Sequence, residues 1–492
     1  MSVVVVGAGP TGLMLAGDLA EAGVPVTILE RRTEESNLTR AFAVHARTLE
    51  LLDLRGLADE LVAQGVRVPE VRPHLKGTEL VVDLRHPESR FPYVLMVAQA
   101  RTEALLARRV RRLGVEIVHG AEVTGLTQDA GGVTLSTRDG RTVRADHVVG
   151  CDGAHSAVRR LLGVGFSGRS YDTTILLADV RLGRDLPLAI NPFVGDEGTA
   201  LLTPYGDGWY RATVWDRTRR DVPLDEPLGI EEVRDSLRRI AGKGLDVVEL
   251  RWSTRFLSER RQADRYRVGR VFLAGDAAHV HSPLGAMGMS TGIQDAANLS
   301  WKLAAAHDGW APRWLLDSFQ EERHPVGRGT LRITDLMLRL AVPPAPLRLI
   351  RPYLAPALLG RPAIARTVRL TLSGLGIAYP VPDGTSGSAL AGRRVPDLEL
   401  TVDGHRRRLY ELARGGRFLL LDLSTDGAAA AAGEPWRERI AVVRAEGTAP
   451  EGATALLVRP DGYVAFGADR PDTAQVRTAL EQWCGAAPSV AV

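Results

Sequence analysis

A run of polar and conformationally special residues at 275–289 has the composition of a ligand-binding loop. Gly275-Asp276-Ala277-Ala278-His279 follows the apolar residues 271–274, and the run continues through Pro283 to Gly288-Met289. An evident helix follows, so the acid stands at a strand end beside a helix N-terminus. Free backbone N–H groups at such a terminus can donate hydrogen bonds to a negatively charged group of a ligand. This loop therefore suits a ligand with hydroxyl groups and electron-accepting edges, but it does not identify that ligand.

The start of the chain carries a glycine pattern in the context that dinucleotide binding requires. Residues 3–6 are four valines, typical of a buried parallel strand, and Gly7-Ala8-Gly9-Pro10-Thr11-Gly12 follows directly. A helix closed by Gly23 comes next, and a second apolar strand then ends at Glu30. Gly7 permits the tight turn, Gly9 lets backbone approach a pyrophosphate, and Gly12 allows close helix–strand packing. Glu30 stands where a carboxylate accepts hydrogen bonds from both ribose hydroxyls.

Two further segments could contribute to the same site. Cys151-Asp152-Gly153 follows a strand expected at 146–150, and Ser156 is placed to cap the next helix. Taken alone, Asp-Gly at this point is typical of a simple turn. Arg40 and Arg47 precede another helix, and their spacing is equally compatible with a solvated face.

The alternation of expected strands and helices around these residues predicts an α/β protein. A chain of 492 residues is too long for one ordinary hydrophobic core, so several domains are expected. We expect a Rossmann-like domain with a helical extension, a strand-rich antiparallel domain inserted into it, and a small α/β domain at the C-terminal end. A helix is expected at 314–322, and an Arg/Leu-rich stretch follows at 328–340. The Rossmann-like domain with its helical extension is assigned to residues 1–73, 98–165 and 267–379. The antiparallel domain is assigned to residues 74–97 and 166–266, and the C-terminal domain to residues 386–492.

Composition excludes several classes of protein. Hydrophobic residues make up 45% and charged residues 25%, which is normal for a globular protein in water. The net charge of +3 does not indicate a nucleic-acid partner, and no apolar run of about 18 residues predicts a membrane span. The start lacks a signal peptide, so a cytoplasmic location is expected. The two cysteines, Cys151 and Cys484, exclude a disulfide framework and a cysteine-ligated metal site, and no metal is expected.

Taken together, the glycine fingerprint at 7–12, Cys151-Asp152-Gly153 and Gly275-Asp276 resemble the group A FAD-dependent aromatic hydroxylases in order and spacing. This is the superfamily of para-hydroxybenzoate hydroxylase and phenol hydroxylase. Within it, the chain is most similar to the aromatic polyketide hydroxylases of antibiotic biosynthesis, which add a thioredoxin-like C-terminal domain. The resemblance extends over essentially the whole chain.

The resemblance implies roles for individual residues. Arg40 and Pro283 lie near the reactive flavin ring and are the catalytic candidates. Asp152-Gly153 contacts both FAD and NAD(P)H, while Asp276 binds the ribityl chain. Backbone N–H groups of Gly288 and Met289 face the flavin pyrimidine edge, where they stabilise negative charge on the reduced ring. The complete set of implied cofactor-binding residues is Gly7, Gly9, Gly12, Glu30, Arg31, Arg40, Gln99, Arg101, Asp152, Gly153, Asp276, Pro283, Gly288 and Met289.

The implied function is a flavoprotein monooxygenase. NAD(P)H, with NADPH favoured, reduces FAD, dioxygen adds to give a C4a-hydroperoxide, and one oxygen atom passes to a large aromatic substrate of polyketide type. The protein itself is expected to be a monomer or a homodimer. A substrate-deprotonating base cannot be assigned among the tyrosines and histidines. The C-terminal domain has no Cys-x-x-Cys motif, which excludes thioredoxin-type redox activity.

The chain departs from the family pattern after the proline. The family has Gly-Gly-x-Gly-x-Asn, whereas this chain has Gly285-Ala286-Met287-Gly288-Met289-Ser290. Ala286 adds a methyl group where the backbone can require a positive φ angle, and Ser290 shortens a polar side chain. Two alternatives therefore stay open: Baeyer–Villiger insertion or epoxidation in place of hydroxylation, and a flavin-binding partner subunit that no longer oxidises.

Overall fold

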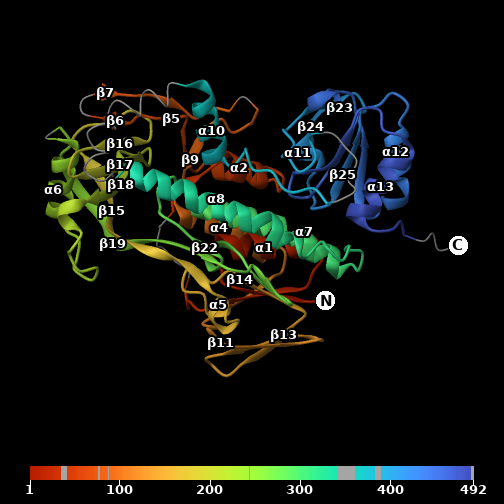
Figure 1. The fold of residues 1–492 in the computed structure, drawn as a ribbon, viewed down its shortest axis with the longest axis horizontal. Helices are drawn as coiled ribbons and strands as arrows, with labels where there is room; N and C mark the ends of the chain where they lie inside the picture. Colours follow the sequence, from red (N-terminus) through yellow and green to blue (C-terminus); the bar gives the residue numbers. More distant parts are fainter. Residues whose placement is uncertain are drawn as a thin grey trace.

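The computed structural model describes residues 1–34, 41–75, 78–86, 88–242, 244–341, 361–382 and 389–488. Figure 1 shows the long helix α8 (Ser318–Ala341) crossing the middle of the molecule. A twisted sheet with helix α6 (Ile230–Ala241) lies at one end of α8, and the C-terminal domain, in blue, lies beyond the other. None of the helices in these ranges has the length and apolar character needed to cross a membrane.

The first domain is built on a six-stranded sheet with the order β10-β2-β1-β14-β21-β20. Its first five strands are parallel, and the two innermost, β1 (Val3–Val6) and β14 (His147–Gly150), are fully buried. Burial on both faces explains the four consecutive valines of β1. The other strands are β2 (Val26–Glu30), β10 (Glu116–His119), β20 (Arg267–Val268) and β21 (Val271–Leu273).

Helices α1 (Pro10–Glu21), α4 (Gln99–Arg112) and α7 (Gly288–His307) pack together beside this sheet. Most of α7 is buried. Shorter helices are α2 (Ala46–Asp53), α3 (Ala58–Val62) and α5 (Ala157–Leu161). A separate three-stranded antiparallel sheet contains β11 (Val123–Asp129), β12 (Gly132–Thr137) and β13 (Thr142–Ala145).

The second unit is an eight-stranded, mainly antiparallel sheet, as expected. Its long central strands, β15 (Phe166–Leu182) and β19 (Val247–Ala263), pair along most of their length. Strand β6 (His74–Leu75) joins this sheet through Phe193, which brings the segment after residue 73 into it. The remaining strands are β7 (Thr78–Glu79), β16 (Asn191–Val194), β17 (Gly198–Pro204), β18 (Trp209–Asp216) and β22 (His279–Val280). Small sheets at its border contain β3 (Ala43–Val44), β4 (Val66–Val68), β5 (Glu70–Val71), β8 (Val82–Asp83) and β9 (Val94–Met96).

Helix α8 corrects one prediction. A helix was expected to end at Glu322, but α8 continues through Pro325 and includes the Arg/Leu-rich stretch at 328–340. Proline removes one backbone hydrogen bond from a helix interior. Glu322 and Arg323, in the turn before the proline, are buried and held by ion pairs to Arg459 and Asp295. These tertiary contacts fix the first part of the helix on the same axis as the second. A further helix, α10 (Pro362–Ser373), follows.

The C-terminal domain has the expected thioredoxin-like arrangement. Its four-stranded sheet has the order β26-β25-β27-β28, with β25 parallel to β26 and antiparallel to β27. Cys484 is buried and unpaired, and burial raises the pKa of its thiol, so it has no redox partner in the described residues. The elements are β23 (Glu399–Val402), β24 (His405–Arg408), α11 (Leu409–Leu412), β25 (Phe418–Asp422), α12 (Ala428–Gly433), β26 (Ile440–Arg444), β27 (Ala455–Val458), β28 (Val464–Ala468) and α13 (Thr473–Cys484).

A buried network of charges joins this domain to the first. Arg459 contacts Glu322 at 2.8 Å and Asp461 at 2.6 Å, and all three side chains are nearly inaccessible. Lys302 also contacts Glu322 at 2.8 Å. Arg47, from α2, donates to the carbonyl oxygen of Asp461. Arg47 therefore forms a contact between the two domains. The alternative that Arg47 belongs to a solvated face is wrong.

Candidate functional site

Three strand ends converge at one edge of the parallel sheet. Strands β1, β14 and β21 are neighbours, and their carboxyl ends carry Gly7, Asp152 and Asp276. A Cβ atom on Gly7 would lie 2.4 Å from the carbonyl oxygen of Cys151, and one on Gly275 would lie 2.6 Å from Oγ1 of Thr11. The three motifs are thus in direct contact. Ligands of open α/β sheets bind at this kind of edge, where strand order reverses.

The glycine turn before α1 leaves a cradle for a phosphate group. Gly7 has a φ of +107°, and a Cβ on Gly12 would lie 2.0 Å from the carbonyl oxygen of Gly7. At Gly9, by contrast, a Cβ would meet nothing within 4 Å. Gly9 is the N-cap of α1, with no side chain bonded to the free N–H groups of the first turn. These donors and the open space above them fit a pyrophosphate.

Glu30 lies at the end of β2 and is buried. Its carboxylate accepts hydrogen bonds from the backbone N–H groups of Ala8 at 2.7 Å and Arg32 at 2.8 Å. The guanidinium of Arg32 also contacts both carboxylate oxygens. Burial works against ionisation, but these donors leave the pKa of Glu30 below its ordinary value. A ribose would have to displace the Arg32 side chain, whereas Arg31 is exposed and makes no hydrogen bond that the structure describes.

Asp152 organises the second motif. Its carboxylate accepts from Oγ of Ser156 at 2.5 Å and from the backbone N–H groups of Ala157 at 2.7 Å and Val158 at 3.1 Å. Ser156 caps α5, as expected, by accepting from the N–H of Arg159. Gly153 has a φ of +82°. Asp152 therefore fixes the loop that packs against Gly7, and its side-chain oxygens already have partners.

Asp276 differs from the other two acids because its carboxylate is exposed. It lies in the short 3₁₀ helix Gly275–Ala277, and among the described residues its side chain accepts no hydrogen bond. A free carboxylate at the edge of the sheet suits the hydroxyl groups of a ribityl chain. Gly288 begins α7 nearby, since a Cβ on it would lie 4.0 Å from Oδ1 of Asp276.

Pro283, Gly288 and Met289 follow Asp276 closely in sequence, in the loop after β22 and at the start of α7. Helix α7 begins at Gly288 without a side-chain cap, so the N–H groups of Gly288 and Met289 are free to face a ligand. Ala286 has a φ of +50°, in the left-handed region. The expectation that this alanine occupies a position of positive φ is confirmed.

His45 holds this loop in place, although no sequence pattern had selected it. Its Nε2 atom lies 2.8 Å from the carbonyl oxygen of Gly285, and its backbone N–H donates to Oγ of Ser290 at 3.4 Å. The imidazole is buried, and burial lowers its pKa. Both departures from the family pattern therefore lie at contacts with His45: Ala286 follows Gly285, whose carbonyl oxygen the imidazole contacts, and Ser290 accepts from the backbone N–H of His45.

Asp295 is a second residue that sequence reasoning missed. From the middle of α7 it accepts hydrogen bonds from the backbone N–H of Gly275 at 3.0 Å and from Nε of Arg323 at 2.6 Å, and it lies 2.7 Å from Nε2 of His279. All four residues are buried. The available signal was the single acid of a helix rich in small and apolar residues, since a buried carboxylate requires partners. Asp295 thus fixes the backbone on which Asp276 stands.

The remaining predicted residues are less closely tied to the loop. Gln99 accepts from the backbone N–H of Ala41 at 3.0 Å and donates to Glu103 at 2.8 Å. Arg101 is exposed and donates to the carbonyl oxygen of Gln64 at 2.6 Å. The structure does not bring Arg101 to Asp276 or Pro283 through any hydrogen bond. Arg40 lies outside the described residues.

An apolar cavity of about 330 Å³ adjoins the loop at Leu284, Gly285 and Ala286. It lies between the loop, the eight-stranded sheet and the end of α8. Cavities of this size and character bind small organic molecules. Its walls come from distant parts of the chain and include Phe42, Leu75, Tyr93, Met96, Ile190, Leu201, Met337 and Leu372, while His45, His86 and Arg369 are its more polar members.

Comparison with known protein families gives two matches. The family described as "FAD binding domain" matches residues 1–334, and the family described as "Aromatic-ring hydroxylase, C-terminal" matches residues 388–487. The first match contains all three motifs of the site. The second covers the thioredoxin-like domain.

Individual relatives align over almost their full length. The 12-dehydrotetracycline 5-monooxygenase/anhydrotetracycline 6-monooxygenase of Streptomyces rimosus is 39% identical, covering 98% of each chain. A dialkyldecalin synthase of Streptomyces rugosporus is 36% identical, covering 99% of each chain. Among solved structures, the anhydrotetracycline hydroxylase of Streptomyces rimosus superposes with a TM-score of 0.86 at 38% identity, covering 99% of each chain.

Proposed function

Since the chain belongs to the FAD-dependent aromatic-ring hydroxylases, a family of flavoprotein monooxygenases, we propose that it oxidises a large polycyclic aromatic molecule of polyketide type. FAD is its cofactor and NAD(P)H the reductant typical of the family. The proposed reaction inserts one atom of dioxygen into the substrate ring during the biosynthesis of an antibiotic or a related secondary metabolite.

The observation that carries this proposal is the apolar cavity of about 330 Å³ beside residues 284–286. Pro283 directly precedes these residues, so a ring bound in the cavity would lie next to the proposed flavin position. The walls offer mostly hydrocarbon and aromatic surface, which suits a fused-ring substrate better than a charged metabolite. We assign residues 74–97 and 166–266, with the end of α8, to substrate binding.

The chain's own residues bind the cofactor, orient it toward the substrate and exclude water from the site. We propose that Gly9, Gly12 and the start of α1 hold the pyrophosphate, with Glu30 and Arg31 at the ribose. Asp276 binds the ribityl chain, and the free N–H groups of Gly288 and Met289 stabilise negative charge on the reduced ring. When bound, FAD supplies hydride acceptance and the activation of dioxygen. Gln99, Arg101, Asp152 and Gly153 remain proposed cofactor contacts, and Arg40 and Pro283 remain the proposed catalytic residues.

The proposal is tested with the purified protein and a panel of polycyclic phenols. The protein should be yellow, and it should consume NADPH faster when a suitable phenol is present, with a product one oxygen atom heavier. Mass spectrometry and NMR of that product distinguish ring hydroxylation from Baeyer–Villiger insertion or epoxidation. A protein that gains no flavin absorbance when FAD is added would refute the proposal.

A second candidate is a flavin-binding protein that forms carbon–carbon bonds without net oxidation. The dialkyldecalin synthase of Streptomyces rugosporus, which aligns with 99% of this chain, favours it. Ala286, an alanine at a positive-φ position where the family pattern has glycine, also separates this chain from that pattern. This candidate predicts FAD binding with no NADPH consumption for any phenol, together with a product of unchanged mass from an unsaturated precursor.

A further inference from the structure

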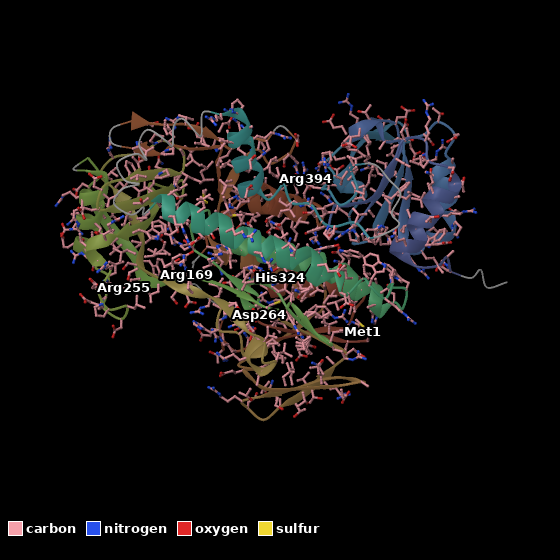
Figure 2. All side chains as sticks on the ribbon, viewed as in Figure 1. Met1, Arg169, Arg255, Asp264, His324 and Arg394 are labelled. Carbon is pink, nitrogen blue, oxygen red and sulfur yellow. The ribbon has the colours of Figure 1, made fainter. Side chains whose placement is uncertain are left out.

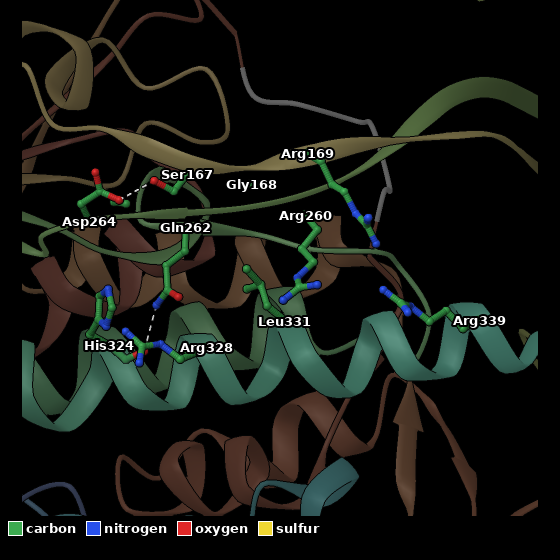
Figure 3. Close-up of a pocket in the computed structure, with 11 residues that line it drawn as sticks. Ser167, Gly168, Arg169, Arg260, Gln262, Asp264, His324, Arg328, Leu331 and Arg339 are labelled. Carbon is green, nitrogen blue, oxygen red and sulfur yellow. Dashed lines mark hydrogen bonds between the residues drawn. The ribbon is translucent and has the colours of Figure 1, made fainter.

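A second cavity, of about 560 Å³, lies on the other side of α8 from the apolar one. It is a cleft between α8 and the paired strands β15 and β19, and it is rich in arginine. Figure 2 places Arg169, Asp264 and His324 in this region. Figure 3 shows Arg328 beside His324 and Gln262 at one end, and Arg169, Arg260 and Arg339 gathered at the other.

The helix presents this face because of residue spacing. His324, Arg328, Leu331, Asp335 and Arg339 follow one another at intervals of three or four residues, so their side chains lie along one side of α8. Opposite them, the backbones of β15 and β19 approach closely. A Cβ on Gly168 would lie 2.0 Å from the carbonyl oxygen of Arg260.

The cleft carries an excess of positive charge. Asp335 is contacted by Arg169 at 3.6 Å, Arg260 at 3.2 Å and Arg339 at 3.0 Å, and it also accepts from the hydroxyl of Tyr171. One carboxylate therefore faces three guanidinium groups, each of which has five N–H donors.

Arg328 adds a fourth cation to the same cleft. It is exposed and forms no ion pair with any residue in the described ranges. Asp264, the other carboxylate of the cleft, accepts from Oγ of Ser167 at 2.7 Å. Four guanidinium groups and two carboxylates leave two positive charges uncompensated, which suits a ligand with at least two negative charges.

The cleft also lies close to the cofactor motif. Gln262 in its wall pairs with His279, and the N–H of Ala263 donates to the carbonyl oxygen of Ala278 at 2.7 Å. Residues 278 and 279 directly follow the Gly275–Ala277 turn that bears Asp276. A long ligand anchored among the arginines could thus extend toward the flavin site.

We propose that this cleft binds the phosphate groups of the reductant NAD(P)H. The inference rests on the proposed function, which requires a reduced nicotinamide dinucleotide. The one dinucleotide-binding turn in the described residues, at Gly7–Gly12, is assigned to FAD. The arginines offer charge-assisted hydrogen bonds to the diphosphate. Association would be steered by charge and weakened by salt.

The experiment follows anaerobic reduction of the bound FAD at increasing NADPH concentrations. Arg260→Gln and Arg328→Gln should each raise the apparent Kd for NADPH about tenfold or more, since each removes charge-assisted hydrogen bonds. The limiting rate of reduction should stay the same, and the double variant should show a weaker dependence of Kd on salt. Flavin content and melting temperature serve as checks of folding.

The matched control is Arg144→Gln, which should leave the Kd for NADPH unchanged. Arg144 is an exposed arginine of β13 that pairs with Asp129 of strand β11 in the same sheet. An unaltered Kd in the double variant, or an equal loss in the control, would overturn the proposal. Calorimetric binding of adenosine 2′,5′-bisphosphate to the oxidised holoenzyme tests the cleft without any turnover. Weaker binding in the double variant supports the cleft even if no phenol is oxidised, and equal binding refutes it.

Discussion

The imidazole of His45 and the carbonyl oxygen of Gly285 lie 2.8 Å apart. This contact ties the start of α2 to the loop that separates the proposed flavin position from the apolar cavity. Burial lowers the pKa of His45, so the ring is neutral near pH 7 and can donate from Nε2 while Nδ1 carries the lone pair. The residue after Gly285 is the alanine with positive φ, so the histidine helps to hold a strained backbone.

Substitution of Ala286 should separate strain from cavity shape. Ala286→Val should destabilise the protein by about 1–2 kcal/mol, because a β-branched residue fits the left-handed region poorly. Its extra methyl groups should also raise the KM for a bulky phenol. Ala286→Gly should change stability by less than about 1 kcal/mol, since relief of strain offsets added chain entropy. Thermal unfolding and steady-state kinetics measure both effects. A valine variant with wild-type KM and melting temperature would contradict this account of the loop.

Asp276→Ala should lower FAD affinity by about tenfold or more, because charge-assisted hydrogen bonds to the ribityl hydroxyls are lost. The unfolding free energy of the apoprotein should change by less than about 0.5 kcal/mol, since the exposed carboxylate has no partner in the described residues. Flavin titration and thermal unfolding test the two halves of this prediction. Glu438→Ala, at an exposed acid of the C-terminal domain, is the control. Full flavin occupancy in the Asp276 variant would disprove the ribityl assignment.

Arg459→Met should destabilise the protein by about 3–5 kcal/mol, because it leaves two buried carboxylates, Glu322 and Asp461, without their main counter-charge. The matched change Arg437→Met breaks an exposed pair with Glu434 and should cost less than about 1 kcal/mol. Urea unfolding gives both values. Equal losses in the two variants would show that the network does not hold the C-terminal domain in place.

His147 should make the protein sensitive to mild acid. Burial and the nearby Arg270 lower its pKa to about 4, against about 6.5 in the unfolded chain. The unfolded state therefore binds the proton first, so stability falls as pH drops below about 6.5 and the loss is complete below about 4. At about pH 5 this histidine alone should cost about 2 kcal/mol.

The His147→Leu variant should accordingly lose less stability than the wild type between neutral pH and about pH 5. Above about pH 4.5 carboxylates such as Glu322, whose pKa is lowered to about 2, remain ionised and do not contribute to the difference. His119→Leu, at an exposed site, should retain the wild-type pH dependence. Identical pH profiles for the wild type and the His147 variant would exclude this explanation.

The sequence predicted those parts of the site that depend on local pattern. The turn at Gly7–Gly12, the acid at the end of β2 and the acid Asp276 after β21 all follow strands whose apolar runs are readable, and the family resemblance supplied their proposed roles. The positive φ at Ala286 was predictable because glycine is usual at that position. Each of these depends on neighbours in the chain.

The remainder depends on contacts between distant residues. His45 meets Gly285 across 240 positions, and Asp295 acquires its importance only when Arg323 and His279 fold against it. The continuity of α8 through Pro325 is likewise held by ion pairs to other elements. The arginine cleft forms only when β15 and β19 pair beside α8. No periodicity in a single segment indicates such contacts.

The central claim, that this protein transfers one oxygen atom from dioxygen to an aromatic ring, is tested most directly by isotope labelling. The FAD-loaded protein is supplied with NADPH, a polycyclic phenol that stimulates NADPH use, and dioxygen made from the heavy isotope. The account predicts a product that carries one heavy oxygen atom on its ring, with ordinary water as solvent. A product whose new oxygen comes from water, or a product without new oxygen, would contradict it.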